Sequence, residues 1–114
     1  MTSEAEFLSR VMYAGRDAGL LVHHAVNRCP GCGLVLHTGT AGLPDLVLVG
    51  WNGMVLRELK SRAGILLPSQ RPWRDRLAGN HFSTPRGDVP VWDIWREPVD
   101  WASGRVEREL AAIT

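Results

Sequence analysis

The sequence predicts an α/β protein in which helices flank a four-stranded mixed sheet. Three observations lead to this fold class: an apolar repeat of helical spacing near the start, three β-rich runs after it, and a helical segment before a fourth β-rich run. Consecutive strands favour an antiparallel meander, and a helix between the third and fourth strands favours a right-handed parallel crossover. The expected order is helix, three strands, helix, strand, helix.

The first helix is expected to begin behind Ser3 and to end at Gly19. Ser3 and Glu6 form a capping-box pattern, in which each side chain bonds the backbone of the other. Four apolar residues then recur at helical spacing: Phe7, Val11, Ala14 and Ala18. Residues 20–26 follow as a short strand, and residues 27–42 form a long connection of the kind that is usually functional or pinned.

The second and third strands are predicted as a β-hairpin over residues 46–49 and 54–59. Asn52 and Gly53 lie between the two runs, and Asn-Gly is the strongest short-range hairpin signal. With these two residues at the centre of the turn, Trp51 faces Met54 and the register continues outward from that pair.

The remaining elements follow from weaker signals. Residues 68–78 are typical of a helix, although Pro72 removes a backbone donor, so this helix is expected to begin later than Pro68. Residues 89–95 are predicted as the last strand. Three apolar residues mark a closing helix, with Ser103 or Asp100 as its cap: Val106, Leu110 and Ile113.

Length and composition indicate one ordinary globular domain over residues 1–114. The chain has 114 residues, 45% of them hydrophobic and 22% charged, with a formal net charge of +1. No apolar run approaches the roughly 18 residues of a spanning helix, and the first residues lack the pattern of a secretory signal. We therefore expect a cytoplasmic protein without a membrane partner, in which any contact with nucleic acid depends on local arginines.

The predicted hairpin register places three ionisable residues on one side of the sheet. It sets Asp45 opposite Lys60 and makes Glu58 a diagonal neighbour of Asp45, at roughly 7 Å between Cβ atoms. Lys60 is the only lysine among 13 basic residues, which suggests a role for a compact ammonium group. Two carboxylates suit Mg²⁺, which prefers oxygen ligands, and the backbone carbonyl of Leu59 offers a third oxygen. A lysine beside the cation would orient water and neutralise charge on a phosphoryl group, so we expect phosphodiester hydrolysis.

These residues carry a resemblance to a known family. Gly42-Leu43-Pro44-Asp45, followed by Glu58-Leu59-Lys60, is similar to the motif of the PD-(D/E)XK nuclease superfamily. Most of the chain resembles its VRR-NUC branch, especially small stand-alone phage and actinobacterial forms, through GLPDLVLVG, ELKS and VWDIWREPVDW. The chain departs from the family pattern at Pro72 and over residues 80–88.

The resemblance implies a restriction-endonuclease-like αβββαβ core, the same order that periodicity predicts. It implies catalytic roles for Asp45, Glu58 and Lys60, with Glu6 as the first-helix acid and Gln70 as a glutamine near the site. Asp45, Glu58 and the Leu59 carbonyl would hold Mg²⁺ or Mn²⁺. Four arginines are candidate DNA phosphate contacts: Arg57, Arg62, Arg71 and Arg74.

The function implied by the resemblance is that of a metal-dependent DNA endonuclease in repair or recombination. Small members of the branch act on branched DNA such as Holliday junctions or flaps, and often form homodimers. Two alternatives stay open on the same fold: a DNA-binding module without catalysis, and a zinc-dependent interaction module. Metal-dependent cleavage assays distinguish both from a nuclease.

The zinc alternative rests on the segment Cys29-Pro-Gly-Cys32-Gly, which is half of a zinc-knuckle pattern. His37 and His24, or His23, could complete a structural Zn²⁺ site. A loose reduced loop, or a redox-active or disulfide pair, are the other interpretations of the two cysteines.

Overall fold

The computed structural model describes residues 4–24 and 42–114. The elements, in chain order, are α1 (Glu4–Asp17), β1 (Leu21–His24), β2 (Leu46–Gly50), β3 (Gly53–Ser61), η1 (Pro68–Gln70), α2 (Arg71–Leu77), β4 (His81–Thr84), β5 (Gly87–Pro90), β6 (Trp92–Glu97), α3 (Val99–Ala102) and α4 (Arg105–Ile113). The main sheet has the order β1-β2-β3-β6. β1, β2 and β3 pair antiparallel, and β6 pairs parallel to β3. The expected α/β class and the four-stranded mixed sheet are therefore confirmed.

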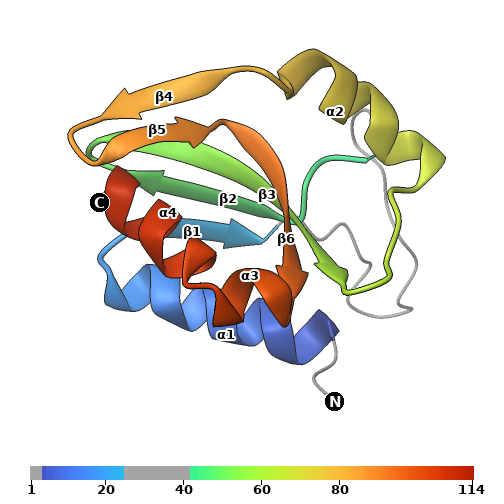
Figure 1. Ribbon diagram of the computed structural model, residues 1–114, viewed down its shortest axis with the longest axis horizontal. Coiled ribbons are helices and arrows are strands. Elements are labelled where there is room, and N and C mark those ends of the chain that lie inside the picture. The colour runs from blue at the N-terminus through green and yellow to red at the C-terminus, as the bar shows by residue number, and fades with distance from the viewer. Residues whose placement is uncertain (1–3, 25–41) are drawn as a thin grey trace, which may run out of the picture.

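The helices lie on both faces of the sheet. α1, α3 and α4 cover one face, whereas α2 lies on the other (Figure 1). Residues along a strand alternate between the two faces, so Val55, Arg57 and Leu59 of β3 turn toward the three helices, and Glu58 and Lys60 turn toward the side of α2. The sheet therefore separates the hydrophobic core from the side chains with candidate chemistry.

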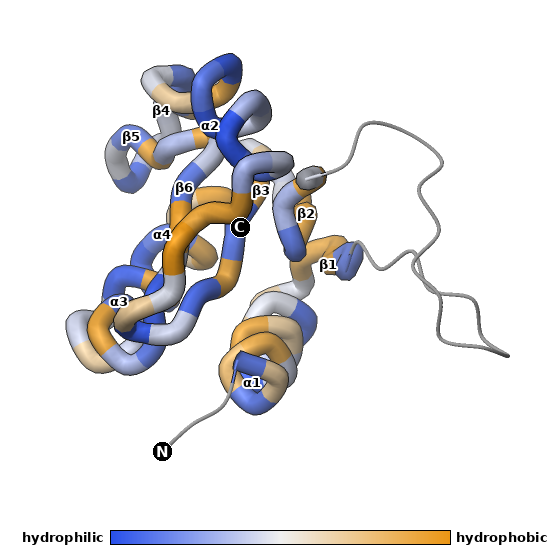
Figure 2. The backbone as a smooth tube through the Cα atoms, turned by 90° about the vertical axis from the view of Figure 1, so that its right-hand side faces the viewer, coloured by the Kyte–Doolittle hydropathy of each residue, from blue (hydrophilic) through white to orange (hydrophobic). Residues whose placement is uncertain are grey.

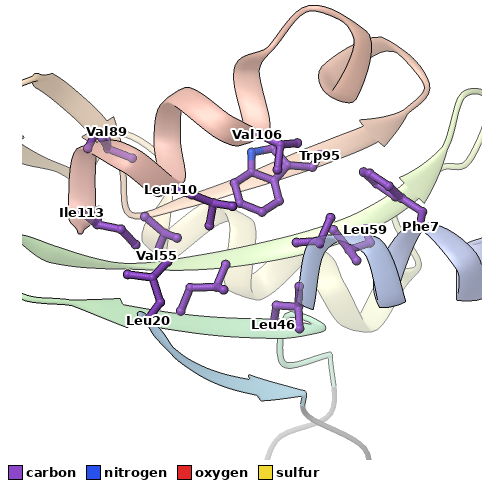
Figure 3. Close-up of a cluster of buried hydrophobic side chains, with 13 residues drawn as sticks. Phe7, Leu20, Leu46, Val55, Leu59, Val89, Trp95, Val106, Leu110 and Ile113 are labelled. Carbon is purple, nitrogen blue, oxygen red and sulfur yellow. The ribbon is translucent and has the colours of Figure 1, made fainter. Parts of the chain in front are cut away.

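The core fills the space between the sheet and the helices α1 and α4. Phe7 and Val11 of α1, Val106 and Ile113 of α4, and Trp95 of β6 are fully buried there. Figure 3 shows Phe7, Trp95, Val106 and Ile113 converging with apolar residues of β2 and β3. α4 forms an amphipathic helix because its apolar positions recur at helical spacing, and Figure 2 shows its hydrophobic colouring.

The turn of the β2–β3 hairpin differs from the expectation. Gly50 pairs with Gly53, so Trp51 and Asn52 form the turn, in place of the predicted Asn52 and Gly53. The reason is tertiary: Asn52 N donates to the Ile113 carbonyl at 3.0 Å, and a Cβ on Gly50 would lie 2.0 Å from the same oxygen. The partner of each β2 residue moves by two positions on β3. Because strand side chains alternate with a period of two, every side chain keeps its predicted face.

The segment from residue 68 to residue 95 is divided more finely than predicted. The expected helix over residues 68–78 consists of η1 and α2, and Pro72 lies in the first turn of α2, where its missing donor costs nothing. The predicted last strand over residues 89–95 is wrong as one unit, since Val89 belongs to β5 and β6 begins at Trp92. Residues 81–90 form a separate two-stranded hairpin, β4–β5.

The closing helix is also capped differently. Gly104, with φ of 77°, is the residue before α4, where Ser103 or Asp100 was expected. The Asp100 carboxylate instead accepts a hydrogen bond from Arg96 N. Among the described residues, no helix combines the length and apolarity needed to cross a bilayer.

Candidate active site

Strand β3 extends beyond β2, and this overhang creates the candidate site. The last pair of the hairpin is Leu46 with Arg57, so Leu59 N and Ser61 N lie beyond β2, where no other strand of residues 4–24 and 42–114 pairs with them. Unpaired backbone donors are costly to bury. The Asp45 carboxylate accepts from Leu59 N at 2.8 Å, and the Glu4 carboxylate accepts from Ser61 N at 3.0 Å. Two acids are thus held along the free edge of β3.

The segment before β2 fixes the position of Asp45. Gly42 has a φ of 92°, and a Cβ there would lie 1.9 Å from the Ser69 carbonyl oxygen, so only glycine fits. Pro44 is fully buried and locks the backbone just before Asp45. The observed register ends with Leu46 opposite Arg57, so the predicted pairing of Asp45 with Lys60 does not form. The Asp45 side chain interacts directly with Glu58 instead.

Glu58 is the most constrained residue of the site. Its side chain is 2% exposed. Its Oε1 accepts from Gln70 Nε2 at 2.8 Å and lies 3.9 Å from Lys60 Nζ. Its Oε2 is buried and has no hydrogen-bond partner among the described residues. A buried carboxylate oxygen without a donor is rare in native structures. Since Glu58 is close enough to the Asp45 carboxyl group for a side-chain hydrogen bond, a proton or a cation between the two acids would satisfy it.

Gln70 and Lys60 hold the Glu58 carboxylate in place. Gln70 Oε1 accepts from Leu67 N at 2.8 Å, so both ends of the Gln70 amide are used and its orientation is fixed. The stem of Lys60 packs over Gly64, where a Cβ would lie 3.2 Å from Lys60 Cβ. The structure thus brings Asp45, Glu58, Lys60 and Gln70 together as the sequence predicted.

Burial, together with a side-chain hydrogen bond to Asp45 and the negative charge of Asp45, raises the pKa of Glu58 from its ordinary value of 4.5 to about 8, and the positive charge of Lys60 opposes this rise. Between these two values the folded protein holds a proton that the unfolded chain releases. We therefore predict that, without metal, the free energy of unfolding falls as the pH rises from 4.5 to 8. Urea unfolding across this range tests the prediction, with Glu58→Gln expected to be clearly less pH-dependent. Equal pH profiles for both proteins would contradict it.

The acid that α1 brings to this edge is Glu4, whereas the role expected for Glu6 stays a prediction. Glu4 lies on the same helix face as Phe7 and Val11, which pack into the core, and its charge acts on Glu58. Glu6 is exposed and lies on another face of α1. Extending the apolar repeat backward by one turn places Glu4 on this face of α1.

His24, at the end of β1, lies near the candidate active site. The zinc hypothesis had made it a candidate Zn²⁺ ligand instead. It lines a cavity of about 140 Å³ together with Glu4, Asp45 and Leu59. The other candidate zinc ligands, Cys29, Cys32 and His37, lie outside the described residues. Within residues 4–24 and 42–114, no three His, Cys, Asp or Glu side chains form a group that could hold a metal ion by themselves.

The four candidate phosphate-binding arginines separate into two kinds. Arg57 is wrong as a DNA contact, because it is 0% exposed and its guanidinium donates to the Pro90 and Val91 carbonyls and to Glu109. It faces the core, since it has the same strand parity as Val55 and Leu59. Arg62 and Arg71 are exposed, and Arg74 forms an exposed ion pair with Asp75.

The residues present fit a hard divalent cation. Mg²⁺ is commonly held by one or two carboxylates, with water and substrate oxygens completing its shell. Asp45 and Glu58 supply two carboxylates, and Glu58 Oε2, which accepts no hydrogen bond from the described residues, offers a ligand atom. The N–H and C=O of one strand residue project to the same edge, so the Leu59 carbonyl lies on the edge where Asp45 bonds Leu59 N.

Comparisons with known proteins give no relative for this chain: no family model matches it, and no curated protein or solved structure is significantly similar.

Proposed function

We propose that this protein is a Mg²⁺- or Mn²⁺-dependent DNA endonuclease with Asp45, Glu58 and Lys60 at its active site. The observation that carries this proposal is the Glu58 carboxylate. Its Oε1 is oriented by Gln70 and Lys60, whereas its Oε2 is buried without a hydrogen-bond partner among the described residues. A buried acid with a raised pKa beside a second acid and a lysine is a frequent feature of catalytic centres.

Each residue has a distinct part in phosphodiester hydrolysis. Asp45 and Glu58 would hold the cation, together with the Leu59 carbonyl oxygen. Lys60 would orient the attacking water in line with the leaving oxygen, and its ammonium would neutralise charge that develops on the phosphoryl group. Gln70 is a positioning residue, because its bond to Glu58 Oε1 keeps the other carboxylate oxygen turned to the ligand.

The cation, when bound, supplies positive charge that stabilises the attacking and leaving oxygens of the displaced phosphate. The pairing of two such sites in a homodimer would give a symmetric cut in both strands of a branched substrate. Support for a branched substrate comes from the resemblance of the motif residues to the VRR-NUC branch of nucleases.

A cleavage assay with Lys60→Met tests the proposal. We expect the wild-type protein to cut DNA in the presence of Mg²⁺ or Mn²⁺ and to show no cleavage in EDTA. The Lys60→Met variant should cut roughly 10²–10³-fold more slowly than the wild type. The matched control is Arg16→Met, which removes an exposed cation at the far end of α1 and should cut normally. Linear, nicked, flapped and four-way DNA identify the preferred substrate. Cleavage that persists unchanged in Lys60→Met would contradict the assignment of Lys60.

A further inference from the structure

The chain reverses direction just after Lys60, and the backbone of this reversal lies against the Lys60 side chain. Gly64 N donates to the Ser61 carbonyl at 3.1 Å, which closes a tight turn over residues 61–64. A Cβ on Gly64 would lie 3.2 Å from Lys60 Cβ and 3.3 Å from Lys60 Cδ. Carbon atoms in favourable contact are about 3.5–4.0 Å apart, so the turn leaves the Lys60 stem no spare room on this side.

The Lys60 ammonium has only a weak tether of its own. Its Nζ lies 3.9 Å from Glu58 Oε1, a distance that is typical of an ion pair and too long for a hydrogen bond. The four-carbon stem of a lysine is flexible, so this ion pair does not by itself define where the ammonium lies. The position of the ammonium therefore depends on the turn that packs against the stem.

Arg96 ties this turn to strand β6. Its Nη1 donates to the Ser61 carbonyl at 3.2 Å and also to the Gly64 carbonyl. Residues 61–63 are exposed, so burial of their side chains does not hold the turn. Hydrogen bonds from a charged donor are stronger than those between neutral groups. The guanidinium therefore holds the first and the last residue of the turn together.

Strand pairing and helix α3 place Arg96 in turn. Arg96 pairs with Lys60 in the parallel ladder of β3 and β6, so both side chains project from the same face of the sheet. β6 lies beside β3 and leads into α3 (Figure 1). In the first turn of α3, the buried Asp100 carboxylate accepts a hydrogen bond from Arg96 N. The backbone of Arg96 is thus anchored on the side of the sheet away from the candidate site.

We infer that Arg96 is a positioning residue: its guanidinium holds the turn over residues 61–64 against the Lys60 stem, and so sets the place of the Lys60 ammonium relative to Glu58. The catalytic consequence rests on the proposed function, in which Lys60 orients the attacking water. Since the Arg96 guanidinium already donates to two backbone carbonyls, it acts through the turn and not on the substrate.

The single lysine of the chain allows a test that needs no cleavage. In protein labelled with ¹³C-lysine, Lys60 gives the only lysine side-chain signals in a proton–carbon NMR spectrum. A stem held in one place keeps its paired Hε protons in different surroundings, so their shifts should differ in EDTA. Arg96→Met should release the turn and bring these shifts together. Arg86→Met is the matched control, because Arg86 is exposed between β4 and β5, and it should leave the Lys60 signals unchanged.

Gly64→Ala tests the contact between the turn and the stem while every charge stays in place. The φ of Gly64 is outside the left-handed region, so alanine can adopt it, but the added methyl group must displace the Lys60 stem or the turn. The Lys60 signals should therefore move. If Arg96→Met does not fold, Arg96→Gln takes its place, because the shorter side chain cannot bond both carbonyls. Unchanged Lys60 signals in either the Arg96 or the Gly64 variant would overturn the inference.

Single-turnover cleavage of one flapped DNA in Mg²⁺ distinguishes positioning from a contact with DNA. Arg96→Met should cut about 10–100-fold more slowly, because a small misplacement of a catalytic group costs this much in rate. The DNA concentration that gives half-maximal rate should stay within about threefold of the wild type. Arg96→Lys should recover most of the rate, since an ammonium can still donate to the carbonyls. A wild-type rate in Arg96→Met, or a loss confined to DNA affinity, would count against positioning.

The positioning role and the nuclease function can fail separately. If Arg96→Met changes the Lys60 signals but the wild-type protein cuts no DNA in Mg²⁺ or Mn²⁺, the nuclease proposal fails and the placement of Lys60 by Arg96 stands. If the wild-type protein cuts DNA, and Arg96→Met keeps both the rate and the Lys60 signals, only the positioning role fails.

Discussion

Glu58→Gln is expected to abolish metal-dependent DNA cleavage, with a rate loss of at least roughly a thousandfold. The substitution keeps the size of the side chain but removes the charge that would hold the cation opposite Asp45. Metal charge at a displaced phosphate contributes several kcal/mol to transition-state stabilisation, which corresponds to this loss in rate. The measurement is single-turnover cleavage in Mg²⁺ and in Mn²⁺, with the same flapped substrate.

The stability of Glu58→Gln separates a catalytic loss from unfolding. A buried carboxyl group loses hydration when it ionises, which destabilises the charged form. The pKa of about 8 means that ionisation of Glu58 is unfavourable in the folded protein at neutral pH. The neutral variant should therefore be at least as stable as the wild type at pH 8.5 in EDTA, by urea unfolding. A stable Glu58→Gln protein that still cuts at more than a tenth of the wild-type rate would remove Glu58 from the proposed mechanism.

The candidate site was predictable because it depends on strand parity more than on exact register. The Asn-Gly signal identified the hairpin but not its turn, which the Ile113 carbonyl shifts through its bond to Asn52 N. A shift by two positions retained the common face of Asp45, Glu58 and Lys60. The contact with Ile113 joins residues 61 positions apart in the chain, and no local pattern could reveal it.

Two further differences from expectation have equally physical causes. Arg57 was a candidate phosphate contact because it lies near the motif residues in the sequence, but strand parity places it on the core face with Val55 and Leu59. The resemblance implied Glu6 as the first-helix acid, whereas the acid that bonds the edge of β3 is Glu4, which accepts from Ser61 N. In both cases the periodicity of the element was the better guide to the residue's position.

The buried position of Arg57 leads to the second large effect: Glu109→Ala is expected to lower the free energy of unfolding by about 3–5 kcal/mol. Glu109 Oε1 accepts from Arg57 Nη2 at 3.2 Å and from Trp95 Nε1 at 2.6 Å. The Arg57 guanidinium also lies 5.1 Å from the centre of the Trp95 ring. Removal of Glu109 takes one hydrogen-bond partner from the buried Arg57 guanidinium and one from the Trp95 indole N–H. The free energy lost when a buried charge is left without its partner exceeds that lost when a surface ion pair is removed.

Guanidinium chloride unfolding monitored by tryptophan fluorescence measures this effect. Glu107→Ala is the matched control, because Glu107 is exposed on the same helix and its loss should change stability by less than about 0.5 kcal/mol. The double variant Arg57→Met with Glu109→Met removes both charges and should recover a large part of the loss, since apolar replacement of a buried ion pair is often neutral. A Glu109→Ala protein as stable as Glu107→Ala would show that Arg57 does not depend on Glu109. The double variant also lacks the Glu109 contact to Trp95. If its free energy of unfolding recovers, the loss in Glu109→Ala comes from the unpaired Arg57 charge and not from the Trp95 contact.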